Sequence, residues 1–139
     1  MKSTTIDMRV IRYLNLFEKI TGVRTKNCLS YNNMIIFAVP SQLIPKAIGE
    51  NGRNVKKIVE TLGKRIKIIV LPSGNDDISR FILDLIEPLQ FRTIEITNTE
   101  IIISANKQSK AYLIGRNKVR FNELNKVLEE YFGKSLRIV

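Results

Sequence analysis

The stretch from Ile44 to Lys57, Ile-Pro-Lys-Ala-Ile-Gly-Glu-Asn-Gly-Arg-Asn-Val-Lys-Lys, decides the fold. Its two glycines, Gly49 and Gly52, separate a short apolar run from a second run with apolar residues at helical spacing, which predicts helix, tight loop, helix. Glycine lacks a Cβ, so it takes positive φ and lets another molecule's backbone come close. The loop also brings the N–H groups that start the second helix to one spot, where the helix dipole favours an anion.

The loop and its flanks form a candidate site for a phosphate backbone. The candidate residues are Ile44, Lys46, Ile48, Gly49, Glu50, Asn51, Gly52, Arg53, Asn54, Lys56 and Lys57. The main chain from Gly49 to Arg53 would hold phosphates, the basic side chains would add charge, and bases would lie over Ile44, Ile48 and a neighbouring strand. Glu50 would repel phosphate unless it points outward. In the alternative reading, Gly49 only ends a helix and Gly52 only opens a turn.

The composition narrows the class of protein. The 139 residues hold 23 Lys and Arg against 13 Asp and Glu, a net charge of +10, which indicates a polyanionic partner such as nucleic acid or an anionic membrane surface. The absence of a long apolar run and of a signal-peptide core predicts a soluble, cytoplasmic protein with no membrane segment. The absence of histidine removes the commonest general base and the usual zinc sites, so we expect no enzyme, no metal and no cofactor.

The single cysteine, Cys28, excludes an intrachain disulfide. It falls in a predicted strand, where a cysteine is more often a small buried apolar residue than a reactive thiol.

The first half of the chain reads as helix, two strands, two helices, strand. The predicted elements are a helix over 5–21 ended by Gly22, strands over 23–31 and 34–39 joined by a turn at Asn32-Asn33, helices before and after the glycine loop, and a strand over 65–71. Pro72-Ser-Gly-Asn75 is the best linker. Asp76 and Asp77 follow it, and we interpret them as helix caps rather than as a catalytic pair.

The second half repeats this order. It predicts a helix from Ile78, strands over 91–97 and 101–105, a short helix over 110–114, a longer helix through Phe121–Tyr131 and a strand over 134–139. Ile48-Gly49 aligns with Ile114-Gly115, and the Gly63-Lys64 pair aligns with Gly133-Lys134. The spacing between these anchors is four residues, about one helical turn, longer in the second copy, so its last helix should be longer.

The motif Ile-Gly-x-x-Gly-x-Asn-Val between two short helices resembles the signature loop of KH nucleic-acid-binding domains. With the element order, each half resembles the type II form of that domain, and the tandem is similar to the archaeal version of the NusA transcription-factor family. The resemblance implies an α+β chain of two KH-like domains, residues 1–72 and 73–139, each a three-stranded sheet packed by helices. It also implies a role in transcription elongation or termination through nascent RNA.

The second loop departs from the pattern, because Lys118 stands where Gly52 stands in the first. A side chain there should obstruct a like-for-like clamp on the phosphate backbone. Its candidate RNA-binding residues are Gly115, Arg116, Asn117, Lys118 and Arg120. They would hold phosphates by their side chains, or the loop is only a solvated basic turn that supports the first domain.

Charge favours the first half as the main site. Residues 1–72 hold 13 basic and 4 acidic residues, against 10 and 9 in residues 73–139. We therefore expect most of the affinity for phosphate to lie in the first half, and single-stranded RNA is the ligand that suits it. The resemblance implies RNA polymerase or the elongation complex as a candidate partner, and we expect a monomeric protein. The rival interpretation is an interaction adaptor that docks on RNA polymerase or the ribosome with little RNA affinity of its own.

Overall fold

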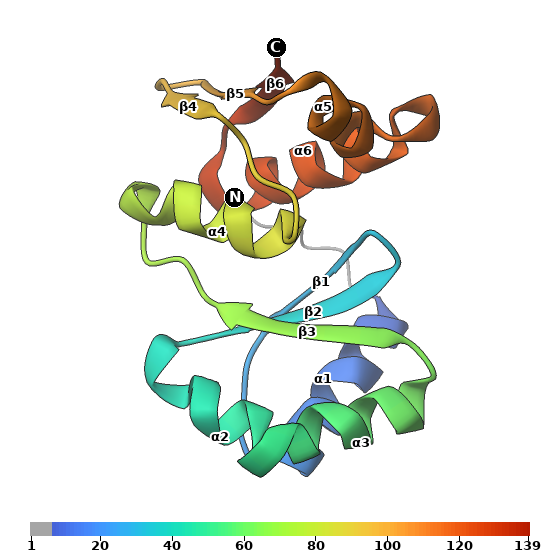
Figure 1. Ribbon diagram of the computed structural model, residues 1–139. Coiled ribbons are helices and arrows are strands. Elements are labelled where there is room, and N and C mark those ends of the chain that lie inside the picture. The colour runs from blue at the N-terminus through green and yellow to red at the C-terminus, as the bar shows by residue number, and fades with distance from the viewer. Residues whose placement is uncertain (1–6) are drawn as a thin grey trace. The chain divides into compact units, whose positions relative to one another are not determined.

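The computed structural model describes residues 7–139, which divide into two compact units (Figure 1). The first unit ends at Leu71 and the second begins at Pro72. Each unit contains a three-stranded sheet with helices packed against it, so the α+β class predicted from the sequence is confirmed. Residues 5 and 6, where the sequence predicts the start of the first helix, lie outside the described residues.

The first unit has the predicted element order. Its elements are α1 (Met8–Thr21), β1 (Asn27–Tyr31), β2 (Met34–Val39), α2 (Ile44–Ile48), α3 (Arg53–Leu62) and β3 (Arg65–Val70), with the short 3₁₀ turns η1 (Ser41–Leu43) and η2 (Glu50–Gly52) before α2 and α3. β2 is the central strand, antiparallel to β1 and parallel to β3. β3 is therefore an edge strand, and it contacts both α2 and α3.

Short polar residues and glycine set the ends of these elements. Asp7 caps α1, because its carboxylate accepts a hydrogen bond from the backbone N–H of Arg9 at 2.8 Å. Gly22 ends α1 with φ at 74°. Asn32 and Asn33 turn the β1–β2 hairpin with φ at 53° and 59°, the left-handed backbone that asparagine tolerates best after glycine.

The core of the first unit lies between the sheet and its helices. The rings of Phe17 on α1 and Phe37 on β2 stack with their centroids 4.3 Å apart. Ala47 on α2 and Ile58 on α3 are fully buried in the same cluster. Both helices that flank the glycine loop are thus anchored on one core, which fixes the position of the loop between them.

The second unit repeats the architecture. Its elements are η3 (Asn75–Asp77), α4 (Ile78–Ile86), β4 (Thr93–Ile96), β5 (Glu100–Ser104), α5 (Lys107–Ile114), η4 (Arg116–Lys118), α6 (Val119–Phe132) and β6 (Ser135–Ile138). β5 is the central strand, antiparallel to β4 and parallel to β6. α6 has 14 residues against 10 in α3, which confirms the predicted difference of four residues. Phe81 anchors this core, with its ring centroid 5.2 Å from that of Tyr131.

Asp77 corrects one sequence-based prediction. Asp77 stands at the N-cap position of α4, but its side chain makes no capping hydrogen bond to the helix. Its Oδ2 instead accepts from the backbone N–H and the hydroxyl of Ser73, both at 2.8 Å, and lies 3.5 Å from the guanidinium of Arg80. The hydrogen bonds from Ser73 lower the pKa of Asp77. The same bonds fix the backbone at the start of the second unit, so the carboxylate does not cap the helix.

Candidate nucleic-acid interface

The first loop is a tight turn with three residues in positive φ. Gly49 has φ 79° and ψ 167°, Asn51 has φ 56° and ψ 29°, and Gly52 has φ 71° and ψ 20°. α2 ends directly before this turn at Ile48, and α3 begins directly after it at Arg53. The predicted helix, loop and helix are confirmed.

The two glycines of the loop have different surroundings. A Cβ on Gly49 would lie 2.9 Å from the side-chain amide of Asn54, so the chain's own packing excludes one. A Cβ on Gly52 would meet no other atom of residues 7–139 within 4 Å. Only the positive φ opposes a side chain at Gly52, and the space above it is left open to another molecule.

Asn54 ties the two helices together across the loop. Its side-chain N–H donates to the carbonyl oxygen of Lys46 at 3.1 Å. The side chain of Lys46 runs over Gly22, where a Cβ would lie 3.4 Å from Cε and 3.7 Å from Nζ. The ammonium of Lys46 therefore lies at the C-terminal end of α1, whose dipole favours a cation, while the sequence predicts it beside the loop.

Fewer main-chain donors are free than the sequence predicts. The N–H groups of Gly49 and Gly52 donate to the carbonyls of Pro45 and Gly49, at 3.0 and 3.1 Å, and the N–H of Arg53 donates to Glu50. The bond from Gly49 closes the C-terminal end of α2, and the other two belong to the 3₁₀ turn before α3. The amides of Glu50 and Asn51, at the tip, have no such backbone acceptor among the residues that the structure describes. Of the main-chain N–H groups from Gly49 to Arg53, those of Glu50 and Asn51 therefore remain available to a phosphate.

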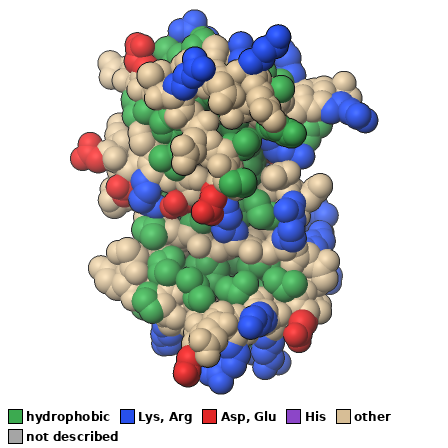
Figure 2. Space-filling view, viewed as in Figure 1, with side chains coloured by type: hydrophobic (Ala, Val, Ile, Leu, Met, Phe, Trp, Pro, Cys, Tyr) green, Lys and Arg blue, Asp and Glu red, His purple; other side chains and the backbone are tan. Residues whose placement is uncertain are grey.

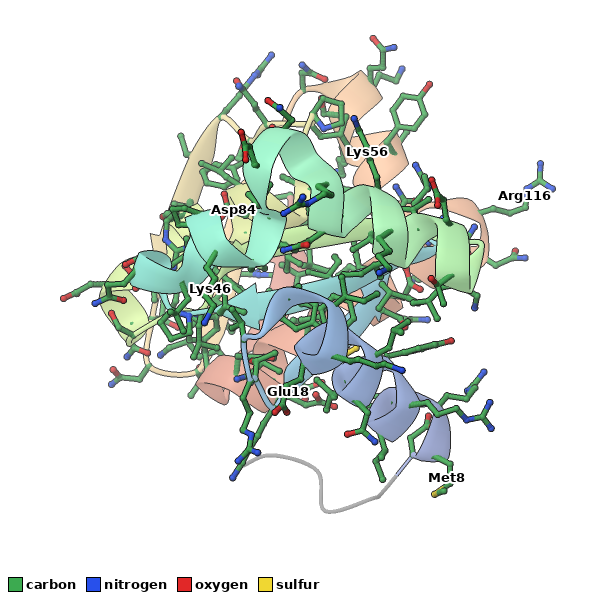
Figure 3. All side chains as sticks on the ribbon, turned by 90° about the horizontal axis from the view of Figure 1, so that it is seen from below. Met8, Glu18, Lys46, Lys56, Asp84 and Arg116 are labelled. Atoms are coloured by element: carbon green, nitrogen blue, oxygen red, sulfur yellow. The ribbon has the colours of Figure 1, made fainter. Side chains whose placement is uncertain are left out.

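Positive charge follows the loop along the exposed side of α3. Arg53, Lys56 and Lys57 are all exposed, and Figure 2 shows Lys and Arg side chains gathered along the lower rim of the first unit, where α2 and α3 lie in Figure 1. Figure 3 shows Lys56 projecting from α3 on the side away from α1. Glu50 is also exposed at the loop tip. Ile44 and Ile48 are half-buried beside the loop, and Ile44 packs on the core.

The second loop has the backbone of the first, although Lys118 replaces Gly52. Gly115 has φ 74° and ψ 172°, Asn117 has φ 55° and ψ 28°, and Lys118 has φ 62° and ψ 22°. Every angle lies within ten degrees of its counterpart. Lys118 therefore does not prevent a matching backbone, because the conformation costs a lysine only about 1–2 kcal/mol. A Cβ on Gly115 would again be excluded, at 2.9 Å from Cβ of Arg120.

The side chains of the second loop differ from those of the first. Arg116, Asn117 and Lys118 are exposed, and Figure 3 shows Arg116 extending outward from its loop. Arg120 takes the place of Asn54, and its guanidinium is paired with the carboxylate of Glu123 at 2.7 Å. Arg120 is thus already engaged by a carboxylate, while the sequence predicts it among the phosphate-binding side chains.

Residues 7–139 contain neither a candidate metal site nor a candidate membrane-spanning helix. No three His, Cys, Asp or Glu side chains gather there in a way that could hold a metal ion. None of the helices in that range is both long and apolar enough to cross a bilayer. Cys28 is half-buried on β1, and burial raises the pKa of its thiol to about 12.

The chain is similar to several archaeal proteins that share one name. It is 27% identical over 135 residues to the "Probable transcription termination protein NusA" of Methanocaldococcus jannaschii, covering 96% of this chain and 64% of the relative. The protein of the same name from Halococcus morrhuae is 23% identical, with 92% of both chains covered. The chain is thus similar to archaeal NusA proteins. No family model matches it.

Further matches to this NusA-like chain extend over different lengths. The NusA protein of Methanococcus vannielii is 32% identical over 84 residues, which are 60% of this chain and 47% of the relative. The chain thus spans less than two thirds of the length of the relatives from Methanococcus vannielii and Methanocaldococcus jannaschii. The crystal structure of APE1850 is 28% identical, with a TM-score of 0.66, and the match covers 96% of this chain and all of APE1850.

Proposed function

We propose that each unit of this NusA-like chain is a type II KH domain and that the chain binds single-stranded RNA, chiefly through the first loop. The observation that carries this proposal is the open space at Gly52. A glycine in positive φ with nothing above it, followed by an exposed basic helix, suits the close approach of a phosphate backbone.

In this mechanism the tip amides of Glu50 and Asn51 donate to phosphate oxygens. Arg53, Lys56 and Lys57 supply positive charge along α3. The negative charge of Glu50 weakens this attraction for phosphate. Bases lie over the half-buried Ile44 and Ile48, toward the edge strand β3. Single-stranded RNA suits the site because its backbone bends and its base edges are exposed. Neutralising about four phosphates would give a slope near −3 for log affinity against log salt.

The relatives, each named as a probable transcription termination protein, support a role in transcription. We accordingly infer a factor that acts on transcription elongation or termination through nascent RNA, as a monomer and without catalysis of its own. RNA polymerase or the elongation complex is the partner protein that this role implies. The alternative is an adaptor that docks on polymerase or ribosome with little RNA affinity.

A matched pair of variants at the two ends of α3 tests this function. Gly52 and Gly63 have φ at 71° and 66°, and a Cβ on either would meet no atom within 4 Å in the part of the chain that the structure describes. Gly52→Asp and Gly63→Asp therefore add the same charge in the same backbone conformation, separated by the length of the helix. Fluorescence anisotropy with an unstructured RNA should show a loss of about tenfold or more for Gly52→Asp and a much smaller loss for Gly63→Asp.

The other outcomes are equally informative. Equal losses in the two variants would indicate a diffuse basic surface in place of a loop site. No saturable binding by the unmodified chain, even at low salt, would favour the adaptor. Circular dichroism is the control that both variants fold. For Gly52→Asp, a folded protein is expected because Lys118 carries a side chain at the equivalent position of the second loop.

A further inference from the structure

The side chains around the second loop combine aromatic surface with charge. Tyr112 in the last turn of α5 is 62% exposed, and Val119 at the start of α6 is 48% exposed. They stand where the first unit has Lys46 and Arg53. The second unit thus presents a ring and an aliphatic side chain at positions that are basic in the first unit.

The positive charge of the second unit is concentrated at this loop. Residues 101–122 contain five basic residues and no acidic one, although residues 73–139 as a whole hold 10 basic and 9 acidic residues. The five are Lys107, Lys110, Arg116, Lys118 and Arg120. Arg120 is paired with Glu123, whereas Arg116 and Lys118 are exposed. The net charge of the whole half therefore understates the attraction of this surface for a polyanion.

Tyr112 lies close to the loop along the chain. Two residues lie between Tyr112 and Gly115, and α5 ends at Ile114, directly before the loop. Its neighbour Leu113 is fully buried, which anchors this turn of α5 in the core and leaves the ring of Tyr112 outside. A fixed backbone beneath an exposed ring suits a stacking platform.

We propose that α5 and the second loop bind a nucleotide of single-stranded RNA, with its base stacked on Tyr112 and its phosphates held by the side chains of Arg116 and Lys118. This inference rests on the proposed RNA-binding function. It gives the second unit a different mode of contact, because Lys118 fills the opening that Gly52 leaves in the first. RNA is favoured over a protein partner because the exposed apolar surface, Tyr112 and Val119, is small and lies among cations. The nearby acidic residue Glu123 is already paired with Arg120.

A single tryptophan can report this contact directly, because the chain contains none. In Tyr112→Trp, an unstructured RNA should quench the indole emission saturably, with the concentration dependence seen by anisotropy. An abasic sugar-phosphate oligomer of equal length should bind with little quenching. Ile96→Trp is the matched control, because Ile96 is a 40% exposed apolar residue on β4, which Figure 1 shows at the opposite end of this unit from α5.

Affinities of variants without tryptophan complete the test. Tyr112→Ala should weaken RNA binding about fivefold or more, and Tyr112→Phe should keep most of the affinity, since stacking on an aromatic ring contributes about 1–3 kcal/mol per base. Two results would contradict stacking on Tyr112 without affecting the proposal for the first loop. One is RNA binding that leaves the indole emission of Tyr112→Trp unquenched, and the other is equal RNA affinity for Tyr112→Ala and the unmodified chain. Absence of RNA binding by the unmodified chain would overturn both proposals.

Discussion

Lys118 repeats in the second loop the left-handed backbone that Gly52 adopts in the first, with φ and ψ of 62° and 22° against 71° and 20°. Glycine reaches this conformation without steric cost, whereas lysine does not. The shared backbone therefore reflects the geometry that two helices joined by this short turn require, and glycine at position 52 is not needed to build it. Glycine at position 52 instead leaves space for another molecule to approach the backbone.

The strain at Lys118 gives a first prediction. Lys118→Gly should stabilise the chain by about 0.5–1 kcal/mol, because relief of the left-handed conformation outweighs the added freedom of the unfolded chain. Urea unfolding of the variant measures this change. Lys126→Gly, at an exposed position inside α6, should lower the free energy of unfolding by about 1 kcal/mol instead. Loss of stability in Lys118→Gly would contradict the assignment of strain to this residue.

The two glycines of the first loop should differ in their effect on stability. Gly52→Ala should cost about 1 kcal/mol, because only its φ is unfavourable. Gly49→Ala should cost well over about 2 kcal/mol, because its backbone region is nearly restricted to glycine and its Cβ would lie 2.9 Å from the side chain of Asn54. Denaturant midpoints of both variants decide this, and equal costs would show that the packing against Asn54 is unimportant.

The buried Lys134 should stabilise the second unit. Lys134 is only 6% exposed, and its Nζ donates to the carbonyls of Thr97 and Asn98 at 2.6 and 3.1 Å. Lys134→Met should lower the free energy of unfolding by about 2 kcal/mol, since hydrogen bonds from a charged donor are lost. Lys64→Met changes the corresponding residue after Gly63, which is exposed, and should have little effect. Comparable losses in the two variants would argue against a specific role for the Lys134 bonds.

Cys28 should make stability depend on alkaline pH. Burial raises the pKa of its thiol from 9.0 to about 12, so the unfolded chain releases this proton at a lower pH than the folded chain. The contribution is complete below pH 9 and is lost as pH rises toward 12. The stability of the unmodified chain should therefore fall more steeply over this range than that of Cys28→Ala. Parallel curves for the two proteins, or rapid reaction of the native thiol at about pH 8, would contradict this.

The sequence predicted the elements best where burial and turn chemistry agree. β2 has the predicted bounds of 34–39, because a continuous apolar run lies between an Asn-Asn turn and Pro40. The start of α5 was harder, because residues 107–109 are polar and carry no periodicity. Its signal is Asn106, whose side-chain oxygen accepts from the N–H of Ser109 at 2.7 Å. α5 thus begins three residues before the predicted helical run.

The candidate site was predictable in its residues and less so in its contacts. The glycine spacing and the basic residues of α3 located the first loop. The direction of the Lys46 side chain and the pairing of Arg120 with Glu123 depend on neighbours that the loop sequence does not specify. The sequence also did not predict the exposure of Tyr112, because an aromatic residue in a helical run is usually expected to lie in the core.

The central claim is that the opening at Gly52 admits RNA to the main-chain amides at the loop tip. Backbone amide chemical shifts, followed by NMR during titration with an unstructured RNA, test it most directly. We expect the largest and saturable changes at Glu50 and Asn51, with smaller ones along the first turn of α3. Saturable RNA binding that shifts other surfaces and leaves the amides from Gly49 to Arg53 unchanged would contradict the account.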